Sequence, residues 1–120
     1  MFQIRSLCVY CGSSNAVDPA HLAAAGDLGE GAARRGIEIV FGGGHVGMMG
    51  ALADGALAAG GRVTGIIPEH LRAREVAHTG ASEMIVVDSM HTRKRRMFER
   101  ADAFCILPGG MAPWTRPSRS

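Results

Sequence analysis

The sequence has no long hydrophobic run, since none of its apolar segments reaches the roughly 18 residues that a membrane-spanning helix needs. It also has no basic N-terminal segment followed by an apolar stretch, so no signal peptide is predicted. Cysteine is scarce, and the odd number of three fits a reducing compartment. The net charge of +2 is too small to indicate a nucleic-acid partner. These absences predict a cytoplasmic protein with no membrane and no nucleic-acid partner.

Glycine, in contrast, is abundant, with 17 residues among 120, about twice its usual share of ~7%. Many of the glycines cluster, which indicates roles at particular positions and not low-complexity sequence. The length fits one domain that is large enough to bury a core.

Apolar runs alternate with helical segments along most of the chain. Because these runs are continuous and not alternating, they are typical of a parallel sheet covered on both faces. The fold class predicted is α/β: a Rossmann-like parallel sheet with helices on both faces and its C-terminal part missing. The predicted strands are 6–11, 37–41, 63–67, 84–87 and 103–107, the predicted helices 19–35, 48–59 and 89–101, and residues 69–82 form a polar connection.

Three loops rich in glycine or serine follow predicted strands, where ligands bind in sheets of this kind. They are Gly12-Ser13-Ser14, Gly42 to Gly47, and Pro108-Gly109-Gly110. In the second loop, Gly42, Gly44 and Gly47 have the spacing G-x-G-x-x-G between a strand and a helix. Such a loop offers backbone N–H groups and a helix N-terminus to an anion. We therefore interpret it as a phosphate-binding loop.

Two alternatives remain for the second glycine loop, namely a tight turn and a dinucleotide site. The dinucleotide site expects an acidic residue at the end of the next strand, where Glu69 stands, but it normally follows the first strand of the fold. No Gly-Lys-Ser/Thr sequence follows, so the loop is not a P-loop.

The helix predicted at 89–101 carries a run of basic residues that includes Arg93 and Lys94. Arginine can bind a phosphate or carboxylate through two parallel hydrogen bonds. The alternative is a solvated helix face. Glu75, in the polar connection, is a candidate site residue or a surface charge.

The cysteines and histidines give weaker indications. Cys8 and Cys11 point to opposite faces of a strand and are interpreted as buried structural thiols. His45, inside the glycine loop, is ambiguous, whereas His21, His70 and His78 are interpreted as surface residues.

Taken together, several segments resemble the LONELY GUY family of cytokinin riboside 5′-monophosphate phosphoribohydrolases, many bacterial members of which carry the label "lysine decarboxylase". The segments match the family in order and spacing over residues 5–111. They are Val9-Tyr10-Cys11-Gly12-Ser13-Ser14, Phe41-Gly42-Gly43-Gly44 with Val46-Gly47-Met48-Met49-Gly50, Ile67-Pro68, Met90-His91-Thr92-Arg93-Lys94, and Leu107-Pro108-Gly109-Gly110.

The resemblance implies hydrolysis of the N-glycosidic bond of a nucleoside 5′-monophosphate, AMP or an N6-modified AMP, to the free base and ribose 5-phosphate. It implies homodimers or larger assemblies. Nothing in the sequence requires a metal, and no cofactor is predicted. A pyridoxal-dependent decarboxylase would need a Schiff-base lysine, and the only lysine is Lys94. Carried over by position, Arg93 is catalytic. The substrate-binding residues are Glu75, Arg93, Lys94, Gly109, Gly110 and Met111, and the phosphate loops hold Ser13, Gly42, Gly43, Gly44 and Gly47.

The family pattern breaks after Met111. The family continues Gly110 with x-G-T-x-x-E, whereas here Ala112 replaces the glycine, Pro113 the threonine and Arg116 the catalytic glutamate. We hypothesise the loss of one nucleotide after the Met111 codon, because a back-translation that regains a G there reads Met-Gly-Thr-Leu-Asp-Glu. Residues 1–111 are then the incomplete Rossmann-like domain, and 112–120 form an aberrant tail.

This break predicts negligible activity, because Arg116 places a cation where the reaction needs an anion. Pro113 and Pro117 oppose the helix expected after the loop. The missing strands and helices are also predicted to leave an apolar sheet edge exposed. The alternative functions are a non-catalytic nucleotide-binding module and a dinucleotide-dependent oxidoreductase.

Overall fold

The structure of the chain is a computed structural model. It describes residues 4–10, 19–45, 47–72, 77–106 and 114–115. The elements are β1 (Ser6–Tyr10), α1 (Pro19–Arg34), β2 (Glu38–Phe41), α2 (Gly47–Ala58), β3 (Val63–Pro68), the 3-10 turn η1 (Glu69–Leu71), β4 (Glu83–Val87), α3 (Met90–Arg100), β5 (Ala103–Ile106) and β6 (Trp114–Thr115). Within these ranges, no helix is both long and apolar enough to cross a membrane.

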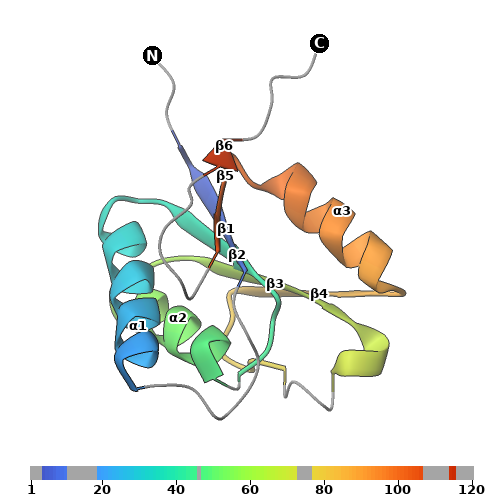
Figure 1. Cartoon of the computed structure of the whole chain (residues 1–120), viewed down its shortest axis with the longest axis horizontal. Helices are drawn as coiled ribbons and strands as arrows, with labels where there is room; N and C mark the ends of the chain where they lie inside the picture. The colour runs from blue at the N-terminus through green and yellow to red at the C-terminus, as the bar shows by residue number, and fades with distance from the viewer. Residues whose placement is uncertain (1–3, 11–18, 46, 73–76, 107–113, 116–120) are drawn as a thin grey trace.

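The strands form one sheet in the order β4-β3-β2-β1-β5-β6. Every pair among β1 to β5 is parallel. Helices α1 and α2 lie together on one face, and α3 crosses the other (Figure 1). The predicted α/β class, with a parallel sheet and helices on both faces, is therefore confirmed. The predicted strands and helices all form within one or two residues of their expected ends.

The sheet separates two hydrophobic cores because successive side chains of a strand point to opposite faces. Val9, Ile39 and Phe41 are buried against α1 and α2. Their neighbours Cys8 and Val40 are buried on the other face with Met97 of α3. The continuous apolar runs of the sequence thus reflect strands that are covered on both sides.

Glycines let α1 and α2 approach each other closely. A Cβ at Gly29 of α1 would lie 2.1 Å from the carbonyl oxygen of Leu52 in α2. A Cβ at Gly55 of α2 would lie 2.3 Å from the carbonyl oxygen of Gly26 in α1. These glycines therefore have positional roles, as the clustering of glycine predicted.

Strand β6 is not among the strands predicted from the apolar runs. It lies within the tail 112–120 and pairs antiparallel with β5, where Thr115 faces Ala103 and Trp114 faces Phe104. The pairing occupies part of the β5 edge that we expected to be exposed, while Ile106 at the end of β5 is 53% exposed. Threonine and tryptophan favour extended backbone, but two such residues are too few to form an apolar run.

Candidate functional site

The strand order reverses between β1 and β5. Strands β2, β3 and β4 follow one another on one side of β1, whereas β5 lies on its other side. In open parallel sheets ligands bind beyond the carboxyl ends of the strands at such a reversal. The chain beyond both strand ends, 11–18 and 107–113, lies outside the described residues. The same holds for these predicted site residues: Ser13, Glu75, Gly109, Gly110, Met111 and Arg116.

Arg93 ties the start of α3 to the carboxyl ends of two strands. Its side chain is buried, its Nε donates to the carbonyl oxygen of Ile66 at 2.9 Å, and its Nη2 donates to the carbonyl oxygen of Gly42. The buried guanidinium therefore has hydrogen-bond acceptors, which a buried charge requires. The arrangement fixes both the arginine and the first residue of the glycine loop.

The space beside Gly42 is filled by this guanidinium. A Cβ at Gly42 would lie 2.4 Å from Arg93 Nη2 and 3.0 Å from Met49 Sδ. The G-x-G-x-x-G spacing predicts that Gly42 lacks a side chain so that a phosphate can approach the backbone. In the structure its missing side chain makes room for Arg93.

The opposite side of the loop is held by the segment that follows residue 76. The backbone N–H of His78 donates to the carbonyl oxygen of Gly43 at 2.8 Å, and Gly44 forms an isolated antiparallel bridge with Ala77. Gly43 has φ +82°, which favours glycine. The loop is therefore clamped between α3 on one side and residues 77–78 on the other.

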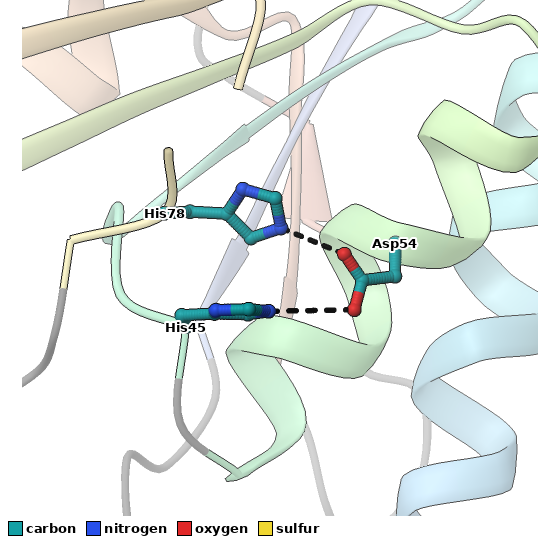
Figure 2. Close-up of side chains that lie close together, drawn as sticks. All are labelled: His45, Asp54 and His78. Carbon is teal, nitrogen blue, oxygen red and sulfur yellow. Dashed lines mark hydrogen bonds and ion pairs between the residues drawn. The ribbon is translucent and has the colours of Figure 1, made fainter. Parts of the chain in front are cut away.

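A cluster of His45, Asp54 and His78 adjoins the loop (Figure 2). His78 Nε2 lies 2.7 Å from Asp54 Oδ1, His45 Nε2 lies 3.5 Å from Asp54 Oδ2, and the ring centroids are 4.4 Å apart. The backbone N–H of Gly80 donates to His78 Nδ1 at 3.0 Å. The interpretation of His78 as a surface residue is wrong, because the residue is 6% exposed. Its partner Asp54 is distant in the sequence, so no local pattern could reveal the pair.

A small pocket of about 120 Å³ opens at the carboxyl ends of β1 and β2. Its lining residues come from β1, the glycine loop, α2 and α3: Val9, Tyr10, Gly42, Met49, Met90, Arg93, Lys94 and Met97. The pocket thus brings together three predicted site residues, Gly42, Arg93 and Lys94. Gly47, with φ +59°, begins α2 and is not among the lining residues.

The pocket combines an apolar floor with basic groups. Lys94 is exposed, whereas Arg93 is buried, so the lysine is the more accessible cation. Burial raises the pKa of the Tyr10 phenol, and the charge of Cys8 adds to the rise, while Arg93 opposes it. Tyr10 is therefore a neutral hydroxyl at ordinary pH. Such a site can accept an anion at Lys94 and an apolar or aromatic group beside the methionines.

The thiols that the structure describes are buried. Cys8 lies in the α3-side core and Cys105 in the α1- and α2-side core. Burial raises the pKa of the Cys105 thiol, which disfavours the reactive thiolate. The structural interpretation is confirmed for Cys8, and Cys11 lies outside the described residues.

Sheet order, helix placement and pocket define a Rossmann-like α/β protein with a candidate ligand site at the carboxyl edge of its sheet. The fold is also that of the molybdenum cofactor carrier protein from Chlamydomonas reinhardtii, with a TM-score of 0.75 and 20% identity over 90% of this chain and 65% of that chain. The molybdenum cofactor binding protein from Rippkaea orientalis gives a TM-score of 0.74 and 21% identity over 92% of this chain and 66% of that chain.

Residues 49–112, just over half of the chain, match the model of the family described as "Possible lysine decarboxylase". The chain belongs to this family, which includes the LONELY GUY phosphoribohydrolases. A cytokinin riboside 5′-monophosphate phosphoribohydrolase from Mycobacterium tuberculosis is 46% identical over 109 residues, 88% of this chain and 56% of the relative. A probable one from Oryza sativa subsp. japonica is 42% identical over 108 residues, 90% of this chain and 48% of the relative. The chain spans about half the length of these curated relatives.

Proposed function

We propose that the chain derives from an enzyme that hydrolyses the N-glycosidic bond of nucleoside 5′-monophosphates, AMP or N6-modified AMP, to free base and ribose 5-phosphate. The observation that carries the proposal is the 40–46% identity to phosphoribohydrolases over about nine-tenths of the chain. The pocket at the carboxyl edge supports it, because its cations suit a phosphate and its methionines suit a base. At about 120 Å³ it is smaller than the roughly 300–1,000 Å³ of complete ligand sites, so it would hold only part of a nucleotide.

Each residue of the proposed site has a part that suits its chemistry. Lys94 binds the 5′-phosphate, together with the loops that contain Ser13, Gly109, Gly110 and Met111. Holding the phosphate positions the sugar for attack by water. Bond cleavage builds positive charge on the sugar, which the carboxylate of Glu75 and the family's catalytic glutamate would stabilise.

In this proposal Arg93 has two roles: it positions neighbouring residues of the site, and it contributes positive charge. Its hydrogen bonds to Gly42 and Ile66 hold the glycine loop and α3 in fixed relation. The residue therefore positions Lys94 and the loop Gly42–Gly47, and its guanidinium adds positive potential beside the phosphate. The proposed reaction proceeds with water and these side chains.

The chain itself would have negligible activity. Arg116 stands at the position of the family's glutamate, and losing a positioned acid or base typically costs about 10²–10⁴ in rate. A cation beside an oxocarbenium-like centre adds electrostatic repulsion to that loss. The second candidate function, nucleotide binding without turnover, follows from the same substitution, because Lys94 and the glycine loop are retained.

The substrate class is tested with a full-length version whose reading frame is restored after Met111. It should release adenine from AMP and not from adenosine, because only AMP carries the phosphate that positions the sugar. Equal release from both would contradict the role of the phosphate. The unaltered chain, titrated with AMP, should show binding without release if the second candidate describes it. Size-exclusion chromatography of both versions tests whether the expected homodimer forms.

A further inference from the structure

We propose that His45, Asp54 and His78 form a binding site for a divalent transition-metal ion such as Zn²⁺ or Ni²⁺. The three residues come from the glycine loop, from α2 and from the segment after residue 76, and their ligand atoms all lie within 4.8 Å of one another. Both imidazoles converge on the Asp54 carboxylate (Figure 2). This inference does not depend on the proposed hydrolase activity.

The donor set has the chemistry of a zinc ligand set. Two imidazole nitrogens and one carboxylate oxygen are ligands that Zn²⁺ binds, with bonds of about 2.0–2.2 Å. Tetrahedral geometry at such bond lengths separates ligand atoms by roughly 3.3–3.5 Å. His45 Nε2 and Asp54 Oδ2 are already 3.5 Å apart, whereas His78 Nε2 and Asp54 Oδ1 are 2.7 Å apart. These two distances involve different carboxylate oxygens. Binding therefore requires the exposed side chains of His45 and Asp54 to shift until one oxygen lies roughly 3.3–3.5 Å from both nitrogens.

The cluster joins one fixed ligand to two accessible ones. The His78 side chain is 5% exposed and its backbone is hydrogen-bonded to Gly43, so it cannot move far. The side chains of His45 and Asp54 are 47% and 60% exposed, and Asp54 lies on the outer surface of α2. An ion can enter from solvent, and water can complete its coordination.

Metal binding must be coupled to a proton shift on His78. Nδ1 accepts the N–H of Gly80, so the proton of the neutral ring is on Nε2, from which it is donated to Asp54. A metal needs the lone pair of Nε2. The proton therefore leaves Nε2, Nδ1 gains one from water, and the Gly80 N–H turns to solvent, where that exposed residue can reach it.

This rearrangement sets the expected strength of the site. Three protein ligands and the loss of two hydrogen bonds, His78 to Asp54 and Gly80 to His78, give a weaker site than a closed four-ligand zinc centre. We expect a dissociation constant on the order of micromolar for Zn²⁺. The bound ion would link the glycine loop to α2 and to residues 77–80. It would also raise the melting temperature, and the rise would grow with the logarithm of the free-ion concentration above the dissociation constant.

The test is a titration of the 120-residue chain with ZnCl₂ in the presence of a non-thiol reductant. Isothermal calorimetry should show one saturable site. Long-range ¹H–¹⁵N spectra of the imidazoles should show His78 changing from the Nε2–H to the Nδ1–H tautomer, while His21, His70 and His91 are unchanged.

Variants assign the ligands. H45A and D54N should each weaken zinc binding at least tenfold, whereas H91A, which removes an exposed histidine of α3, should bind zinc like the unaltered chain. The proposal is overturned if no saturable binding occurs, if both variants bind zinc unchanged, or if His78 keeps its Nε2 proton at saturation. The three side chains would then form a hydrogen-bonded cluster that does not bind metal. The tautomer measurement needs no variant, so a folding defect in H45A or D54N cannot obscure the result.

Discussion

Arg93 shows how helical register separates one arginine from its basic neighbours. Arg93 and Met97 lie on the face of α3 that meets the sheet and are buried, whereas Lys94, Arg95 and Arg96 are exposed. The basic run of the sequence therefore has two parts with different roles. Arg93 donates hydrogen bonds to backbone carbonyl oxygens, and the exposed residues face solvent.

Replacing Arg93 by alanine should lower the free energy of unfolding by about 2–4 kcal/mol, because the buried carbonyl oxygens of Gly42 and Ile66 would lose their donor. R96A is the matched control on the exposed face and should change stability by less than about 0.5 kcal/mol. Urea unfolding measures both. Equal stability of the two variants would show that the hydrogen bonds of Arg93 to Gly42 and Ile66 do not stabilise the fold.

Asp88 and Thr92 provide a test of electrostatics at the start of α3. The Thr92 hydroxyl donates to Asp88 Oδ1 at 2.7 Å and is the largest cause that holds the pKa of Asp88 below its ordinary 3.8. Because the folded pKa is lowered, the stabilisation from this contact is present above pH 3.8 and is lost as the pH falls through the folded pKa.

The variant T92V should therefore raise the pKa of Asp88 toward 3.8, since it removes the donating hydroxyl. NMR titration of the carboxyl carbon measures the change. A pKa that stays at the value found in the unaltered chain would mean that the hydroxyl is not the cause.

At the scale of elements, the contact between α1 and α2 depends on small residues at particular positions. A Cβ at Gly29 would lie 2.1 Å from the α2 backbone, whereas a Cβ at Gly26 of the same helix would lie 3.7 Å from its nearest α2 atom, an ordinary contact. The two glycines look alike in the sequence. Their different surroundings come only from the way the helices pack.

Gly29→Ala should destabilise the protein by about 1–3 kcal/mol, because the helices must separate to admit the methyl group. Gly26→Ala should be neutral or stabilising by up to about 1 kcal/mol, since alanine favours helix more than glycine does. Thermal unfolding followed by circular dichroism compares them. If the two variants melt together, α1 and α2 are not packed as closely as the structure describes.

At the scale of the whole molecule, the class of fold and the positions of the glycine-rich loops could be predicted from the sequence. Apolar runs locate β1 to β5 because buried parallel strands need apolar side chains on both faces. The cluster of His45, Asp54 and His78 could not be predicted, because it depends on how residues 77–80 fold back onto the glycine loop. The contact between Gly42 and Arg93 is missed for the same reason, since 51 residues separate them.

The frameshift that we hypothesise after Met111 should be visible in the gene. Resequencing should show that one G regained after the Met111 codon restores the reading frame to Gly-Thr-Leu-Asp-Glu. A Pro113 codon with no such relation to the restored frame would contradict the frameshift hypothesis and leave Arg116 as a native residue.

The central proposal is that this chain derives from a phosphoribohydrolase whose catalytic glutamate is replaced by Arg116. Its most direct test is adenine release from AMP, measured for the purified chain and the frame-restored full-length protein in parallel. We predict release by the restored protein and none above background by the chain. Release by the chain at a comparable rate, or by neither protein, would contradict the account.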